Sequence, residues 1–180
     1  MNPLQGWRAS WAERRQERAE RGRELLEQKA AAAKSSADFE ARHRLRLEKA
    51  ISVSSMEMAC HRDTWEAIEK IVFPVTGYRI PYYGIVGQQR FPQNRITRSG
   101  TDERSTVKLS GPHLVRCLTV FRAVLAVGTN HFTSDPEVYA LSRRMYDLLG
   151  ARVDAVDMNS SEGALPVLIV DASLEETPEA

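Results

Sequence analysis

The sequence has few of the features that would place it in several large classes of protein. Only two of its 180 residues are cysteine, Cys60 and Cys117, too few for the disulfide framework of a small secreted domain. Its most apolar stretch, residues 114–127, contains Arg116 and Arg122 and is too short and too charged to span a bilayer. The N-terminus lacks the apolar core of a secretory signal. We therefore expect free thiols, no membrane partner, and a location in the cytoplasm or within a particle assembled there.

No catalytic motif stands in the context that its chemistry requires. Residues 167–171 match the strand of a Walker B motif, but the chain has no Gly-Lys-Ser/Thr loop that could cradle nucleotide phosphates. Residues 61–63 match three letters of a kinase catalytic loop without its following Asn. Ser105 and Lys108 fit Ser-x-x-Lys, but they fall in a predicted strand instead of on a helix. We expect no enzyme, no catalytic residue, no cofactor and no small-molecule substrate.

Two pairs of cysteine and histidine are candidate ligands for zinc. His113 precedes Cys117 by four residues, so the two would share one face of a helix, as ligands of one ion must. Cys60 and His61 are adjacent, and neighbours on a helix point about 100° apart. Neither pair has zinc-finger spacing, and free cysteine is among the most buried residue types. We therefore expect no metal site.

The charge is distributed unevenly along the chain. Residues 1–50 carry 12 Lys/Arg and 8 Asp/Glu, residues 51–150 carry 12 and 9, and residues 151–180 carry 1 and 7, for a net charge of +1. A mildly basic body with an acidic end is typical of a protein that faces a polyanion. It is equally typical of a protein whose acidic tail only maintains solubility.

The N-terminal part of the chain predicts a charged helix over residues 7–33. Its apolar stripe consists of Trp7, Trp11, Leu25 and Leu26, and the residues between them are small, polar or charged. Such a stripe is too thin to bury the helix in a core. We expect this helix to project as an arm and to contact another chain through these four residues.

The pattern after the arm predicts three further helices. Residues 34–36 (KSS) indicate a break with a cap, and residues 37–72 then follow a helical apolar stripe, with a kink or split near 51–55. A strongly apolar helix is expected over 111–127. A last helix follows the capping box of residues 134–137 and ends at Leu149, with Gly150 as its C′ residue.

Strands are expected in the middle and near the end of the chain. Glycine and proline punctuate residues 75–110, and Arg95–Arg98 with Ser105–Leu109 should form a hairpin around a five-residue loop. Residues 151–156 and 165–170 should form a small sheet packed on the last helices. The fold class is therefore helix-dominated α+β. We divide the chain into an arm (1–34), a single globular domain (35–172) and an acidic tail (173–180).

The segment from residue 78 to residue 108 is the best candidate for a binding site. It combines basic side chains, which neutralise phosphates, with aromatic rings, which accept stacked bases. The candidate nucleic-acid-binding residues are Arg79, Arg90, Arg95, Arg98, Arg104, Lys108, Tyr82 and Tyr83, with Tyr78 and Phe91 nearby. A solvated surface hairpin whose aromatic residues pack in the core would show the same pattern.

These observations support two hypotheses. The first is a non-enzymatic, self-assembling structural protein that contacts nucleic acid, as in viral or phage particles or packaging machines. The second is a protein-only adaptor or scaffold, whose arm and arginine-rich loop bind subunits or partners. We expect a homo-oligomer. Because Arg95 and Arg98 would lie on opposite faces of one strand, the first hypothesis requires a groove or channel instead of a flat surface.

Overall fold

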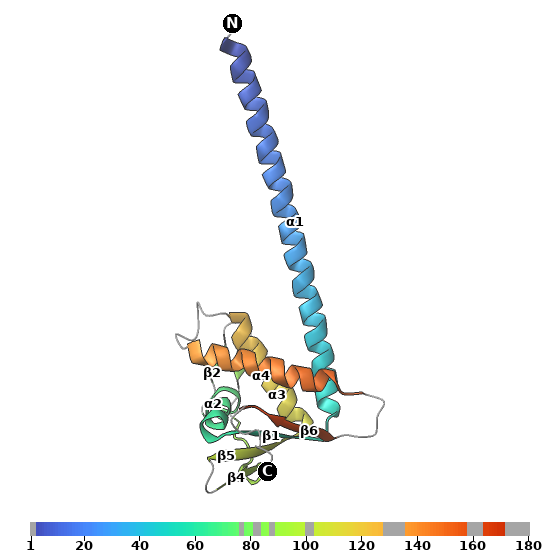
Figure 1. Ribbon diagram of the computed structural model, residues 1–180, viewed down its shortest axis with the longest axis vertical. Coiled ribbons are helices and arrows are strands. Elements are labelled where there is room, and N and C mark those ends of the chain that lie inside the picture. Colours follow the sequence, from blue (N-terminus) through green and yellow to red (C-terminus); the bar gives the residue numbers. More distant parts are fainter. Residues whose placement is uncertain are drawn as a thin grey trace, which may run out of the picture. The chain divides into compact units, whose positions relative to one another are not determined.

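The computed structural model describes residues 3–75, 78–80, 84–86, 89–99, 103–127, 136–157 and 164–171 (Figure 1). Only the backbone is described for residues 3–15, 19, 78–80, 84–86, 127 and 164. The chain divides into two compact units, Met1–Arg44 and Leu45–Ala180. The protein is a helix-dominated α+β protein, as predicted, with one long N-terminal helix and a small sheet packed against helices.

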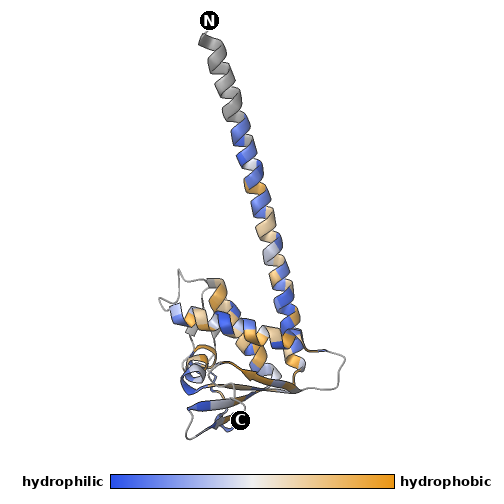
Figure 2. Ribbon diagram, in the orientation of Figure 1, coloured by the Kyte–Doolittle hydropathy of each residue, from blue (hydrophilic) through white to orange (hydrophobic). Residues whose placement is uncertain are grey.

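The first helix, α1, is longer than expected and runs without interruption over Pro3–Ser52. The predicted break at residues 34–36 is wrong, and those residues continue the helix. The four alanines at 30–33 have the highest helix propensity, and serine inside a helix costs only about 0.5 kcal/mol relative to alanine. Figure 2 shows that the described part of α1 before residue 45 is largely hydrophilic, and every described side chain between residues 16 and 38 is exposed.

The predicted helix over residues 37–72 is in fact three elements. Its first part belongs to α1, Ser55–His61 forms strand β1, and Arg62–Val72 forms helix α2. The seven-residue spacing of Ile51, Met58, Trp65 and Val72 favoured a continuous helix. The alternation of buried side chains within β1 is instead that of a strand, and the suspected discontinuity near 51–55 marks its start.

A four-stranded sheet has the order β4-β5-β1-β6. β4 (Ile96–Arg98) and β5 (Arg104–Leu109) form the predicted antiparallel hairpin. β1 is antiparallel to β5 and parallel to β6 (Ala164–Ile169). A separate two-stranded sheet pairs β2 (Tyr78–Ile80) with β3 (Gly84–Val86), and the short 3₁₀ helix η1 (Gln93–Arg95) leads into β4.

The helices α2, α3 (Gly111–Val127) and α4 (Pro136–Asp154) lie on one side of the sheet (Figure 1). The core forms between these two layers. It contains Met56, Met58 and Cys60 from β1, Val107 and Leu109 from β5, Trp65, Ile68 and Val72 from α2, Leu114, Leu118 and Phe121 from α3, Met145 and Leu149 from α4, and Leu168 from β6. Full burial of such side chains contributes roughly 1.5–3 kcal/mol each.

The end of the chain differs from the prediction. Residues 151–154 continue α4 and do not form a strand, so β6 pairs with β1 and not with residues 151–156. Gly150 lies inside α4 and does not end it. The Arg46 side chain occupies the space where a Cβ atom at residue 150 would stand, with Nη1 only 2.7 Å from that position. The glycine signals a close packing contact, whereas the sequence suggested a helix stop.

The last turns of α1 are fixed within the second unit. Arg46 forms a two-pronged ion pair with Asp154, with its Nε and Nη2 atoms 3.0 and 2.7 Å from the carboxylate oxygens, and Lys49 donates to the Asp154 carbonyl oxygen (2.7 Å). The backbone N–H of Gly111 donates to the carbonyl oxygen of Val53 (3.0 Å), which joins the start of α3 to the end of α1.

Candidate nucleic-acid interface

Two of the predicted basic residues lie on the face of the sheet opposite to the helices. Arg104 and Lys108 alternate with buried residues along β5, so both point to the face that α2, α3 and α4 do not cover. We call this face the open face. Across the ladder from β5, Arg104 pairs with His61 and Lys108 with Glu57 of β1. Lys108 is exposed and Arg104 is half-buried.

Arg98 lies on the other face, the one that carries the helices. Its partner in the ladder is the buried Ser105, and directly paired residues share a face. Arg95 precedes β4 and belongs to η1, so the expectation that Arg95 and Arg98 lie on opposite faces of one strand is wrong. The basic residues therefore surround the β4–β5 edge of the sheet, with Arg98 on one face and Arg104 and Lys108 on the other.

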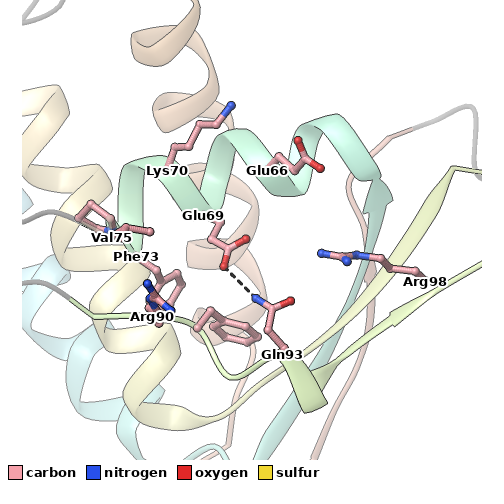
Figure 3. Close-up of a pocket in the computed structure, with 10 residues that line it drawn as sticks. Glu66, Glu69, Lys70, Phe73, Val75, Arg90, Gln93 and Arg98 are labelled. Carbon is pink, nitrogen blue, oxygen red and sulfur yellow. Dashed lines mark hydrogen bonds between the residues drawn. The ribbon is translucent and has the colours of Figure 1, made fainter.

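Arg98 faces a groove of about 620 Å³ between α2 and the segment that leads into β4 (Figure 3). Arg90 and Lys70 line the same groove. Neither the ion pairs nor the hydrogen bonds among the described residues engage the side chains of Lys70, Arg90 or Arg98. The groove thus brings together two predicted arginines and one lysine that the sequence did not single out.

Two carboxylates also line the groove, and both have partners. Glu66 pairs with Arg62 one turn earlier on α2, with 3.1 Å between Nε and Oε1. Glu69 accepts a hydrogen bond from Nε2 of Gln93 (3.3 Å), which Figure 3 shows crossing the groove. Within the described lining of the groove, Lys70, Arg90 and Arg98 are therefore the charged groups without a partner, and they can meet an anionic ligand.

The floor of the groove is aromatic, but its rings are not accessible for stacking. Phe91 is 2% exposed and packs edge-on against Trp65 and Phe73, with ring centroids 4.9 and 5.0 Å apart. Arg116 of α3 lies over the Phe73 ring (5.6 Å). The sequence grouped Phe91 with possible base-stacking residues, and that interpretation is wrong because the ring belongs to the core.

Three predicted residues lie where the structure describes little. Tyr82 and Tyr83 fall outside the described residues. Arg79 belongs to β2, for which only the backbone is described. Trp7 and Trp11 likewise lie on the part of α1 described by backbone alone, whereas Leu25 and Leu26 are 51% and 67% exposed.

A cluster at the carboxyl ends of β1 and β6 was missed by the sequence reasoning. The Asp171 carboxylate accepts a hydrogen bond from the backbone N–H of His61 (2.7 Å) and lies 3.7 Å from Nη1 of Arg144. Nε2 of His61 is 3.0 Å from the Glu103 carboxylate, and the backbone N–H of Arg62 donates to the Glu103 carbonyl oxygen (2.7 Å). These contacts tie the β4–β5 loop and the end of β6 to the start of α2.

The signal for this cluster was visible in the sequence but was interpreted differently. Residues 61–63 and 167–171 matched fragments of catalytic motifs, and both fragments end at this edge because parallel strands place their carboxyl ends together. Glu103 adopts a positive φ of 50°, a backbone conformation that residues other than glycine and asparagine rarely adopt. Each charged group here has a partner within the fold, which is the arrangement of a structural junction.

The candidate zinc ligands do not come together. Cys60 lies in β1 and Cys117 in α3, and burial raises the pKa of both thiols to about 12. His113 accepts the backbone N–H of Ser110 at Nδ1 (3.2 Å), and its pKa is lowered first by burial and then by Arg95. Among the described residues, no group of three or more His, Cys, Asp or Glu side chains is placed to hold a metal ion.

Comparisons with protein-family models, with curated proteins and with solved structures found no match to this chain. Within the part of the chain that the structure describes, no helix has both the length and the apolar character needed to cross a membrane.

Proposed function

We propose that the protein is a non-enzymatic, self-assembling structural protein that contacts nucleic acid, a component of a particle or packaging assembly formed in the cytoplasm. The observation that carries this proposal is the distribution of cations around the β4–β5 edge. Arg98 and Arg90 face the groove, and Arg104 and Lys108 face the open side of the sheet. A flexible phosphate chain that passes around this edge can contact both sets.

The geometry favours phosphate contacts over base recognition. Phe91 and Phe73 are buried, so the described lining of the groove supplies no free ring for a base. Lys70, Arg90 and Arg98 are long side chains that suit a flexible polyanion. Binding should therefore depend weakly on sequence and strongly on salt. Self-assembly adds to this, because many weak sites on one particle engage one strand together.

The test is salt-dependent binding of a labelled single-stranded oligonucleotide, followed by fluorescence anisotropy. The variant Arg90→Ala/Arg98→Ala should weaken binding at low salt and lower the slope of log K against log salt by about 1.4, because each single-strand phosphate contact contributes roughly 0.7. Arg104→Ala/Lys108→Ala should act similarly from the other face.

The matched control is Arg143→Ala, which removes an exposed arginine of α4 that lines neither the groove nor the β4–β5 edge. It should leave the slope within about 0.3 of the wild-type value, well below the roughly 0.7 expected for one lost contact. A loss in Arg143→Ala that is half of the loss in each double variant would show that only net charge matters, because the control removes one charge and each double variant removes two. No binding by the wild-type protein at low salt would exclude nucleic acid as the partner.

A protein-only adaptor or scaffold is the second candidate, and the two carboxylates in the groove favour it. Glu66 and Glu69 would repel a phosphate chain, whereas a protein segment of mixed charge could pair with both signs. An absorbance ratio at 260 and 280 nm typical of pure protein, with no nucleic acid bound after purification at low salt, would favour this candidate.

A further inference from the structure

The two edges of the four-stranded sheet are built differently. β4, at one edge, has three residues and carries the exposed Arg98. β6, at the other edge, has six residues, ALPVLI, and no charged side chain. Short length, charge, proline and β-bulges are the devices by which natural edge strands avoid pairing with other chains. β4 has the first two. In β6, Pro166 and an irregular register with β1 protect the first half of the strand, but residues 167–169 carry neither charge nor proline.

The free edge of β6 can be assigned from its ladder with β1. The backbone N–H of Val170 donates to the Ala59 carbonyl oxygen (2.9 Å), so the peptide groups of Leu168 and Val170 face β1. By alternation, Val167 and Ile169 direct their N–H and C=O groups away from the sheet. Among the described residues, β1 is the only strand that pairs with β6.

The side chains of these two residues lie on the open face. Val167 is 46% exposed and Ile169 is 38% exposed, and in the described part of the second unit they join Leu45, Ile51 and Val75 as the exposed large hydrophobic residues. Ile169 pairs with Ala59 of β1 in the ladder. The free backbone groups and the exposed apolar side chains thus belong to the same two residues.

We propose that β6 pairs antiparallel with β6 of a second copy of this chain, around a two-fold axis, so that two four-stranded sheets become one sheet of eight strands. Val167 lies opposite Ile169 of the partner subunit, and the symmetry repeats that pair. This inference names the interface for the self-assembly part of the proposed function and rests on it.

A second copy is the occupant that the charges favour. An uncharged strand meets no like-charge repulsion when it pairs with itself, and the two-fold axis places apolar side chains against apolar side chains on the same face. At the β4 edge, the same operation would place Arg98 opposite Ile96 of the partner subunit and bring two like charges onto the same face of the joined sheet. A protein partner selected by charge would find no complementary group on β6.

The size of the contact predicts its strength. Two six-residue strands bury less than the roughly 1,200 Å² of a stable standard interface, so the isolated contact should be weak and concentration-dependent. Contacts of the exposed Leu25 and Leu26 on α1 would then act together with it, because two linked weak interfaces strengthen each other.

The first test is sedimentation velocity of the full chain over a wide range of concentrations. Val167→Lys and Ile169→Lys place a charge at the edge and should raise the dimer dissociation constant at least about tenfold, the effect of 1.4 kcal/mol. Thr97→Lys is the matched control, because Thr97 is an exposed residue on the open face of the opposite edge strand. Thermal unfolding checks that all three variants remain folded.

The second test is disulfide trapping, which does not depend on destabilising the interface. The native residues Cys60 and Cys117 are 0% and 1% exposed, so only the introduced cysteines should form disulfides between subunits. A mixture of Val167→Cys and Ile169→Cys proteins should form cross-linked dimers faster than a Thr97→Cys protein does. Cross-linking no faster than in that control would overturn the proposal.

The outcomes separate this interface from the proposed function. If Leu25→Gln/Leu26→Gln abolishes association and the β6 variants associate normally, the β6 interface is wrong and self-assembly stands. If the wild-type chain is a monomer at every concentration, the β6 interface and the self-assembly part of the proposed function are both wrong.

Discussion

The two parts of α1 are stabilised in different ways. Between residues 16 and 38, every described side chain is exposed. The ion pair of Glu17 with Arg21 (3.1 Å) joins two exposed side chains within the same helix. From Arg46 onward the helix contacts α4, and the residues that follow it contact α3. The first part depends on local propensity and the second on tertiary packing. Replacing glycine by alanine should therefore stabilise a region that depends on local propensity and destabilise a region that depends on tight packing.

Gly111→Ala should have the largest effect. A Cβ atom at this position would lie 2.5, 2.8 and 2.9 Å from the carbonyl oxygens of Ile51, Ala50 and Val53. These are backbone atoms, so the end of α1 and the start of α3 would have to separate. We expect a loss of about 3 kcal/mol in the free energy of unfolding, measured by urea denaturation and near-ultraviolet circular dichroism. A loss below about 0.5 kcal/mol would show that this contact is not tight.

Arg46→Met should have the next largest effect. The substitution keeps most of the apolar stem but removes the two-pronged pair with Asp154 and the contact over the Tyr146 ring (5.3 Å). The Arg46 side chain is 19% exposed and that of Asp154 is 48% exposed, so water already screens part of the attraction. We expect a loss of about 1–2 kcal/mol in the free energy of unfolding.

The matched control for this pair is Arg44→Met, which removes an exposed arginine only two residues earlier in α1. It should change stability by less than about 0.5 kcal/mol. A double-mutant cycle with Asp154→Asn should give a coupling energy for Arg46 and Asp154. Additive effects in that cycle would mean that the pair contributes nothing beyond its separate side chains.

His113 should make the stability of the contact between the start of α3 and the end of α1 sensitive to pH. Its Nδ1 accepts the N–H of Ser110, next to Gly111, and burial lowers its pKa in the folded state. The unfolded chain therefore binds the proton more readily, and stability should be complete above the ordinary histidine pKa of about 6.5 and fall as the pH decreases below it. The limiting slope for one such group is about 1.4 kcal/mol per pH unit.

The test is urea denaturation of wild type and His113→Asn between pH 5 and 8. The asparagine side chain can accept the same N–H but does not titrate in this range. The stability of the variant should fall less steeply below pH 6.5 than that of the wild type. Parallel curves would show that the imidazole is not responsible.

The sequence predicted the elements whose signals were local and missed those that depend on partners. Helix α3 and the β4–β5 hairpin follow from strong apolar periodicity and turn residues. β1 was predicted as helix because Met58 and Trp65 also satisfy a helical spacing, and only pairing with two other strands selects the extended form. Gly150 was assigned to a helix end because nothing local reveals that Arg46 crosses α4 at that point.

The candidate site was predicted in part for the same reason. The composition of residues 78–108 indicated a basic surface, and Arg98 and Arg90 do share a groove. Lys70 was not included, because it comes from α2 and reaches the groove only through tertiary structure. The assignment of Phe91 to a binding surface was wrong, since composition does not distinguish an aromatic ring in the core from one at the surface.

Gly22→Ala should have the smallest effect and the opposite sign to that of Gly111→Ala. Apart from its chain neighbours and the backbone of its own helix, no described atom lies within 4 Å of the position that a Cβ atom would take at Gly22, and the residue is exposed inside α1. Alanine should therefore stabilise the surrounding turns by about 0.5–1 kcal/mol, since glycine loses more backbone entropy in a helix. The urea midpoint of the second unit should not change, because the gain is local. Amide hydrogen exchange over residues 16–30 should slow by roughly two- to fivefold, the factor that corresponds to this free energy. An unchanged exchange rate would mean that opening of these turns is limited elsewhere along α1, and that the arm does not follow local propensity.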